Sequence, residues 1–125
     1  MIKRLTHVTI MVRDQDEALD WYTRKLGFKK VHDERGTIPG LRWPTIAPAG
    51  QESPEIVLLK AQDGDAVGRG AMWVLEADDC RKTYEELRAR GVTFRSAPED
   101  APWGVSAVFE DLYGNQFNLV EPRAR

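Results

Sequence analysis

The chain has 125 residues, of which 42% are hydrophobic and 30% are charged, and its formal net charge is −2. This composition is typical of one globular domain with a sizeable core, and the small negative charge excludes the basic surface of a nucleic-acid-binding protein. No apolar run approaches the ~20 residues of a membrane span, and the single cysteine, Cys80, excludes an internal disulfide. We therefore predict a cytoplasmic protein without nucleic-acid or membrane partners.

The sequence of the first half predicts a strand, a helix and three more strands. Residues 5–12 alternate between apolar and polar, as in a strand with one buried face. Asp14 or Asp16 can cap the helix that follows, and Gly27 can end it. The three further strands are predicted at residues 28–34, 41–47 and 55–60, with glycine and proline in the turns between them.

The second half repeats this order after a polar, glycine-containing stretch at residues 61–70, which is typical of a linker. Asp79 takes the place of Asp14 at an offset of 65 positions (79 − 14), and Gly91 takes that of Gly27 at an offset of 64 (91 − 27). A strand opens this copy at Ala71, and further strands are expected at 92–95, 105–111 and 116–121, with a loop at 96–104. We predict a single domain of two βαβββ modules, residues 1–60 and 71–125, in a pseudo-twofold arrangement.

Two motifs resemble the vicinal oxygen chelate superfamily, which contains glyoxalases, bleomycin-resistance proteins and extradiol dioxygenases. The first is a strand that opens with His7, followed by an Asp-capped helix that carries Trp-Tyr and ends in Leu-Gly-Phe. The second is the pattern F-x-D-x-x-G-N-x-F-x-L-x-E, which occupies residues 109–121. The resemblance implies an α+β fold in which the strands of two modules curl into a cup. It also implies a homodimer.

In metal-using members of this superfamily, four strand positions supply the metal ligands, and this chain departs from that pattern. His7 occupies the first position, where it is either a ligand or only a polar residue that lines the cup. Glu55 or Val57 occupies the second, because the repeat does not fix the register. Met72 and Asn118 occupy the third and fourth, in place of His and Glu. A thioether and a neutral amide oxygen are weak ligands for divalent metals, so we predict no metal cofactor.

Other side chains are candidates for the lining of the cup. Trp43 and Trp103 can form aromatic walls for a flat ligand, or they can pack against the outer edge of the sheet. Glu76 faces the cup by alternation, where it can orient a ligand or form a salt bridge. Tyr113 lies in the turn LYGN near the expected mouth of the cup, whereas His32 is expected at the surface of a charged strand.

Two classes of function remain open from the sequence. The first is a small-molecule-binding protein of the glyoxalase/bleomycin-resistance type with a degenerate metal site, and the missing metal ligands favour it. The alternative is a lyase, isomerase or dioxygenase of the same superfamily, which acts through a metal or with His7 or Glu76 as a base. We predict the first, as a homodimer that holds a small organic ligand. The predicted cup residues are His7, Trp43, Glu55, Met72, Glu76, Trp103, Tyr113 and Asn118.

Overall fold

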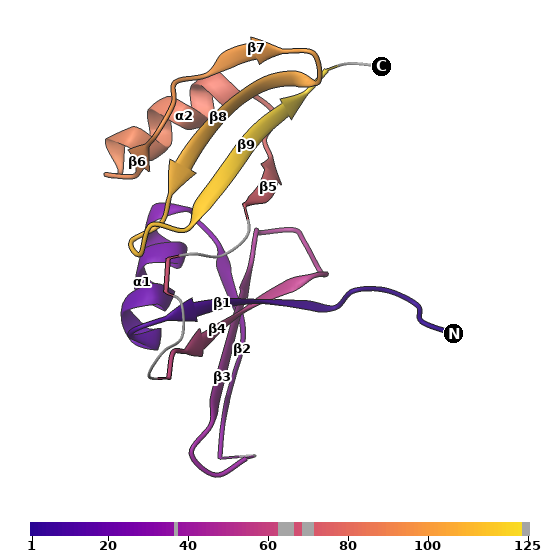
Figure 1. Cartoon of the computed structure of the whole chain (residues 1–125), viewed down its shortest axis with the longest axis vertical. Helices are drawn as coiled ribbons and strands as arrows, with labels where there is room; N and C mark the ends of the chain where they lie inside the picture. The colour runs from indigo at the N-terminus through magenta and orange to yellow at the C-terminus, as the bar shows by residue number, and fades with distance from the viewer. Residues whose placement is uncertain (37, 63–66, 69–71, 124–125) are drawn as a thin grey trace. The chain divides into compact units, whose positions relative to one another are not determined.

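A computed structural model describes residues 1–36, 38–62, 67–68 and 72–123 of the chain (Figure 1). The chain divides into two compact units, residues 1–67 and 68–125. Much of the predicted linker lies outside the described residues. Within these ranges no helix is long and apolar enough to cross a membrane.

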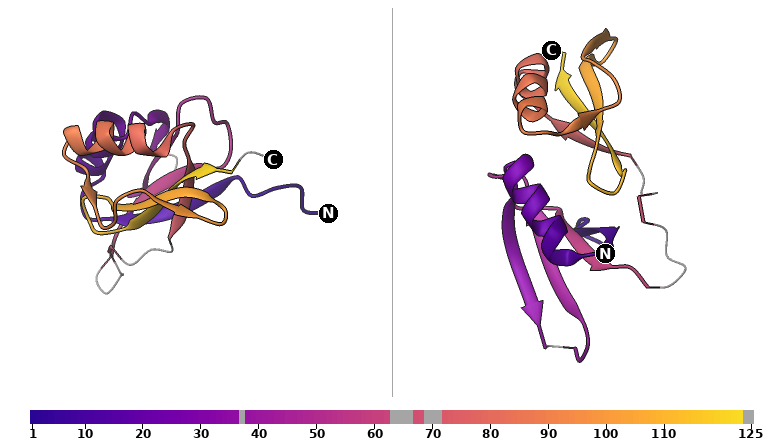
Figure 2. Two further views of the ribbon diagram at one scale, coloured as in Figure 1. Left: turned by 90° about the horizontal axis from the view of Figure 1, so that it is seen from above. Right: turned by 90° about the vertical axis from the view of Figure 1, so that its left-hand side faces the viewer.

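The first unit is a four-stranded sheet with one helix on one of its faces (Figure 2). The strand order is β1-β4-β3-β2, in which β1 and β4 are parallel and the other neighbours are antiparallel. This is the predicted βαβββ order. The elements are β1 (His7–Val12), α1 (Gln15–Lys25), β2 (Lys29–Arg35), β3 (Arg42–Ala47) and β4 (Glu55–Lys60).

Local sequence explains where α1 begins and ends. The Asp14 side chain accepts a hydrogen bond of 2.9 Å from the backbone N–H of Glu17, so Asp14 is the N-cap. Gly27 follows the helix with a φ of 71°, a left-handed conformation that glycine adopts without a steric penalty. Ala18 and Tyr22 lie one turn apart and are fully buried, as expected for the face that packs on the sheet.

The second unit has the same strand order as the first. Its sheet runs β5-β9-β8-β6, and the strand after the linker, β5, pairs in parallel with the last strand, β9, as β1 does with β4. The predicted repeat is therefore confirmed for the topology within each unit. The elements are β5 (Trp73–Glu76), α2 (Cys80–Ala89), β6 (Thr93–Phe94), β7 (Glu99–Ala101), β8 (Gly104–Glu110) and β9 (Gln116–Pro122).

The loop predicted at residues 96–104 is only partly a loop. Residues 99–101 form β7, which pairs antiparallel with β8. Local sequence could not predict this strand, because its hydrogen bonds come from a neighbouring strand and its three residues include two acidic ones with low strand propensity.

The second helix is capped by the counterpart of the first cap. The Asp79 side chain accepts a hydrogen bond of 3.0 Å from the N–H of Lys82, and Gly91 has a φ of 90° after the helix. At the start of α2, the N–H of Cys80 donates to the Glu121 carboxylate of β9 at 2.9 Å. The Cys80 thiol is buried, and this burial raises its pKa.

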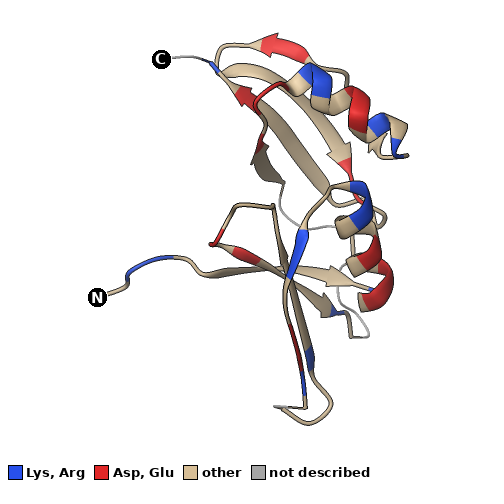
Figure 3. Cartoon of the chain, turned by 180° about the vertical axis from the view of Figure 1, so that it is seen from behind, with Lys and Arg blue, Asp and Glu red and all other residues tan. Residues whose placement is uncertain are grey.

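Aromatic rings fill the core between α2 and its sheet. Tyr84 on the helix meets Phe94 edge-on with ring centroids 4.6 Å apart, and Phe94 in turn lies 5.5 Å from Phe109. Phe109 and Phe117, which are cross-strand partners on β8 and β9, stack at 5.3 Å and are fully buried. Both helices carry acidic and basic residues (Figure 3).

The D-x-x-G-N part of the second motif builds the turn between β8 and β9. The buried Asp111 carboxylate accepts hydrogen bonds from the N–H groups of Tyr113 and Asn115 at 2.8 and 2.9 Å. Its other oxygen accepts from the Asn115 side-chain amide at 2.8 Å. Gly114 supplies the left-handed position of the turn, with a φ of 90°. The Asp, Gly and Asn of the motif are therefore the residues that stabilise this turn. The predicted turn at residues 112–115 is confirmed.

Candidate functional site

Five side chains of the first unit gather on the face of its sheet opposite to α1, and we call them the Glu55 cluster. Strand pairing brings them together, because β1 and β4 place His7 opposite Glu55 while β2 and β3 place His32 opposite Thr45. Trp43 lies two residues before Thr45 on β3 and therefore shares its face. The members are His7, His32, Trp43, Thr45 and Glu55.

Glu55 is the centre of this cluster. Its Oε1 accepts a hydrogen bond of 2.6 Å from the hydroxyl of Thr45, which is fully buried, and lies 3.1 Å from Nδ1 of His32. Its Oε2 lies 3.7 Å from Nε2 of His7. The Thr45 hydrogen bond, supported by His32, holds the pKa of the Glu55 carboxyl below its ordinary value. The carboxylate is therefore ionised at neutral pH, which makes it an acceptor and a weak general base.

His7 connects this polar centre to an aromatic wall. The centroid of its ring lies 6.3 Å from that of Trp43, with the planes tilted by 57°. The other ring nitrogen, Nδ1, lies 3.0 Å from the hydroxyl of Thr6. The His7 side chain is 40% exposed, whereas that of Glu55 is 14% exposed. A molecule from solvent can therefore reach His7 first and the carboxylate behind it.

Trp43 also lines an open, largely apolar pocket of about 470 Å³ at the end of the β2–β3 hairpin. The other described lining residues are Glu34, Ile38 and Leu41. A pocket of this volume lies within the usual range for small-molecule sites, which are mostly apolar with a few polar groups. Trp43 thus belongs to the pocket and to the Glu55 cluster, and it joins the two.

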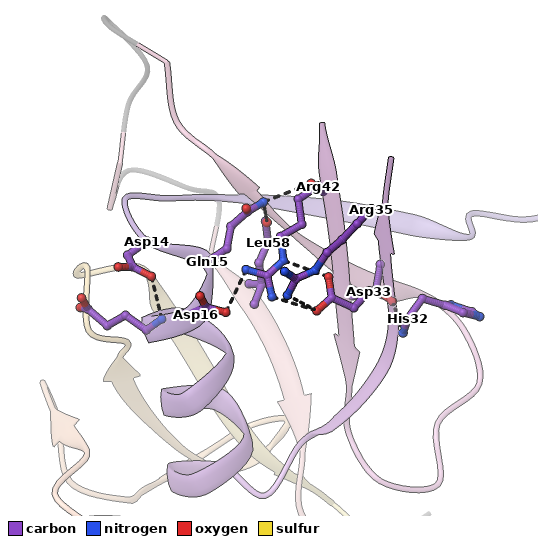
Figure 4. Close-up of polar contacts among 10 residues, drawn as sticks. Asp14, Gln15, Asp16, His32, Asp33, Arg35, Arg42 and Leu58 are labelled. Atoms are coloured by element: carbon purple, nitrogen blue, oxygen red, sulfur yellow. Dashed lines mark hydrogen bonds and ion pairs between the residues drawn. The ribbon is translucent and has the colours of Figure 1, made fainter. Parts of the chain in front are cut away.

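A hydrogen-bonded network on the opposite face of the sheet holds this hairpin in place (Figure 4). The Arg42 guanidinium donates two hydrogen bonds to the Asp33 carboxylate, at 2.9 and 2.8 Å, and a third to Asp16 of α1 at 2.9 Å. Gln15 of α1 donates to the carbonyl oxygens of Arg42 and Leu58. Arg42 holds the pKa of Asp33 well below its usual range. Because β2 and β3 are fixed to α1, the neighbouring residue Trp43 has a defined position.

Of the eight predicted site residues, the structure brings His7, Trp43 and Glu55 together. The alternative second position, Val57, is fully buried and lies opposite Thr9. In the second unit, Asn118 lies opposite Val74, and Val74 is the repeat counterpart of Thr9 at the offset of 65 (74 − 9). Val57 is therefore the counterpart of Asn118.

The other five predicted residues belong to the second unit. Met72 precedes β5 and is 49% exposed. The amide Oδ1 of Asn118 is buried, and it has no hydrogen-bond partner in the described part of the chain. Glu76 lines an open polar depression of about 520 Å³ together with Asp78 and Glu121. Trp103, which is 58% exposed, and Tyr113 lie on turns at opposite ends of β8.

Two members of the cluster, His32 and Thr45, were not predicted as site residues. His32 is exposed, as expected, but it also contacts Glu55. The β2–β3 pairing is irregular between Lys30 and His32, and such a bulge changes which side chains share a face. Nothing in the alternation of β2 indicates it. The one sequence feature that could have indicated the role of His32 is that both histidines and Glu55 lie on predicted strands of the first unit, and this feature is weak.

The positions that the resemblance assigns to metal ligands carry fewer His and Glu side chains than in metal-using members of the superfamily. The first unit supplies one imidazole, His7. Its counterpart of Asn118 by strand pairing is Val57, which has no donor atom, and the Oε1 of the neighbouring Glu55 is engaged with Thr45. The second supplies the thioether of Met72 and the neutral amide of Asn118, which are poor ligands for such ions. Among the residues that the structure describes, no group of three or more His, Cys, Asp or Glu side chains could hold a metal ion. His7 and His32 contact different oxygens of Glu55.

Comparison with known proteins agrees with the fold. The family model of the glyoxalase/bleomycin resistance protein/dioxygenase superfamily matches residues 4–119. UcmS2 is 41% identical with a TM-score of 0.85, and the alignment covers 97% of this chain and 99% of that one. A superfamily member from Sphaerobacter thermophilus is 39% identical with a TM-score of 0.87, over 96% and 98% of the two chains. TnmS3, an antibiotic binding protein from Streptomyces sp. CB03234, is 30% identical with a TM-score of 0.83, over 98% of each chain. The chain belongs to the glyoxalase/bleomycin resistance protein/dioxygenase superfamily.

Proposed function

We propose that this protein binds a small organic molecule of the antibiotic type and holds it without chemical change against the Glu55 cluster and the adjoining pocket. The observation that carries the proposal is the position of Trp43, which is a wall of the apolar pocket and a neighbour of the His7 ring. An apolar wall beside a few fixed polar groups is the usual composition of a small-molecule site. The similarity to TnmS3, an antibiotic binding protein, supports the same function.

The enzyme alternative has less support from the cluster. A general base works best when its pKa lies near the working pH, whereas the Thr45 hydrogen bond lowers the pKa of Glu55. The donor set also argues that ligand binding needs no metal. We therefore infer that the purified protein holds no stoichiometric divalent metal, which elemental analysis checks. About one Ni, Zn, Fe or Mn per chain, lost in His7→Ala, would make the enzyme the leading proposal.

A thermal-shift and tryptophan-fluorescence screen of aromatic and antibiotic compounds tests the binding function. A compound at 100 times its Kd should stabilise the protein by about 2.7 kcal/mol, so a true ligand is visible as a shift in Tm. Trp43→Ala should abolish that shift, whereas Trp21→Phe, a change on α1, should leave it in place. If no compound shifts Tm or fluorescence, the binding function is wrong.

The predicted homodimer remains part of this proposal. Light scattering across micromolar concentrations measures it directly, and a single-chain mass throughout that range would exclude it.

A further inference from the structure

The two oxygens of the Glu55 carboxylate have different surroundings. Oε1 accepts the hydroxyl of Thr45 and contacts His32. Oε2 has only Nε2 of His7 near it in the described residues, at 3.7 Å, which is longer than a hydrogen bond. An ionised carboxylate can accept hydrogen bonds at both oxygens. Among the residues that the structure describes, Oε2 of Glu55 therefore has no hydrogen-bond donor, on the side of the carboxylate that faces His7.

Oε2 and His7 Nε2 lie close enough for one polar atom beside them to bridge the pair. An oxygen atom placed ~2.8 Å from each of two atoms that lie 3.7 Å apart makes two hydrogen bonds of ordinary length. A hydroxyl can donate to Oε2 and at the same time accept from Nε2–H of His7. The Thr6 hydroxyl, 3.0 Å from Nδ1, can donate to that nitrogen and so favour the tautomer with the proton on Nε2.

We propose that the ligand of this site is a hydroxylated aromatic compound, whose hydroxyl group bridges His7 Nε2 and Glu55 Oε2 from one side while its ring packs on Trp43. This inference rests on the proposed binding function and adds the chemical class of the ligand. The Trp43 ring and the apolar pocket beyond it supply the surface for the rest of a flat molecule.

Other polar groups satisfy this position less well. An ammonium group donates hydrogen bonds but cannot accept one from His7. An ether oxygen accepts but cannot donate, so it leaves Oε2 without a partner. A carboxylate would be repelled by the ionised Glu55. With the His7 proton on Nε2, the pair needs a group that both donates and accepts, and a hydroxyl is such a group.

Calorimetric titration of the full chain with two matched probes tests this inference. The probes are 2-naphthol and 2-methoxynaphthalene. They share the same fused ring, and in the second a methyl group replaces the hydroxyl hydrogen, so it can accept but not donate a hydrogen bond. We expect 2-naphthol to bind about 10-fold to 100-fold more tightly, the usual range for a hydrogen bond to a charged group. Trp43→Ala should weaken both probes equally, because it removes the shared ring contact.

Glu55→Gln is the decisive variant. Its side-chain oxygen is needed by the Thr45 hydroxyl, so its NH₂ group takes the position of Oε2 and turns the acceptor into a donor. The preference for 2-naphthol should then fall to about twofold or less. Glu52→Gln, a change of an exposed carboxylate in the loop before β4, should keep the full preference and controls for net charge.

His7→Phe supplies a second reading, because it keeps an aromatic ring beside Trp43 and removes the Nε2 donor. It should reduce the preference without weakening 2-methoxynaphthalene. Equal binding of the two probes by the unchanged protein overturns the hydroxyl inference alone, since binding itself is then shown. A preference that survives Glu55→Gln also overturns it. If neither probe binds, the inference fails, and the compound screen decides the proposed function by itself.

Discussion

The two units of the chain share a helix-facing side and differ on the opposite side of the sheet. The N-caps Asp14 and Asp79 make the same hydrogen bond to a backbone N–H three residues on, and the strand orders match. On the opposite side, His7 of the first unit corresponds to Met72 of the second, and Val57 corresponds to Asn118. The first unit thus carries a fixed carboxylate with hydrogen-bonding neighbours there, and the second carries a thioether and an isolated amide.

This difference separates the residues that fold each unit from the residues of the proposed binding site. Caps, left-handed glycines and apolar helix stripes are needed wherever a βαβββ module forms, so both copies keep them. The residues on the opposite side of the sheet are not needed for these caps, turns and helix contacts. There the two units carry chemically different side chains. The proposed binding function needs one polar centre beside an aromatic side chain, and among the described residues the Glu55 cluster of the first unit supplies it.

The largest effect should follow from breaking the helix-facing side. Phe109→Ala removes a fully buried ring that stacks on Phe117, and it should lower the free energy of unfolding by about 3–5 kcal/mol. The matched change on the opposite side, Val74→Ala, removes an exposed side chain and should stay within about 0.5 kcal/mol of the unchanged protein. Urea denaturation measures both, and equal losses would contradict the separation.

The next largest effect is a gain of metal affinity, which should follow when the second unit receives the His and Glu of metal-using superfamily members. The double change Met72→His with Asn118→Glu adds an imidazole and a carboxylate, which suit Zn²⁺ and Ni²⁺. We expect the affinity for either ion to rise by several kcal/mol, because metal binding in small domains is worth that much or more. Calorimetry measures it, with Met72→His alone as the control. No gain of affinity in the double variant over Met72→His alone would contradict this prediction.

A smaller effect should come from the Arg42 network, which only the first unit is shown to have. Asp33→Asn removes the negative charge that accepts two hydrogen bonds from Arg42 and one from Arg35, and it should cost about 2 kcal/mol of stability. Asp20→Asn, which breaks an exposed helix pair with Arg24, should cost little or nothing. Chemical denaturation of the two variants compares them, and equal costs would show that the network does not hold the hairpin.

The same network predicts a dependence on pH. Arg42 places the folded-state pKa of Asp33 below the unfolded value of about 3.9. Its stabilisation is therefore complete above that unfolded value and is lost as the pH falls below it toward the folded pKa. The difference in stability between the unchanged protein and Asp33→Asn should shrink between pH 5 and pH 3 when it is followed by thermal unfolding. These two pH values are about one unit on either side of the unfolded pKa.

Much of the fold could be predicted because its signals are local. Asp79 and Gly91 mark the ends of α2 from their own chemistry, and the residues of the D-x-x-G-N turn contact one another within five positions of the chain. The apolar run at Glu55–Lys60 gave the bounds of β4 as observed. The short strand β7 was missed because its pairing with β8 is what makes it a strand.

The candidate site was only half predictable for the same reason. His7 and Glu55 were found through the superfamily pattern, and Trp43 through its type and its place on a strand. The roles of His32 and Thr45 depend on the register between β2 and β3, which shifts at a bulge. The contact of Arg42 with Asp33 and Asp16 also joins three separate elements, so the periodicity of any single element does not show it.

The outer strand of the first sheet has a consequence for the behaviour of the protein at high concentration. β2 reads KKVHDER, so five of its seven residues, Lys29, Lys30, Asp33, Glu34 and Arg35, carry a full charge. An edge strand offers unpaired backbone groups to any other strand that approaches, and charges and bulges on it oppose such pairing. β2 has both devices, since its pairing with β3 is interrupted after Lys30. Replacing the four charged residues other than Asp33 by threonine or valine would keep the backbone hydrogen bonds to β3, and we expect it to favour pairing of β2 with other chains and aggregation.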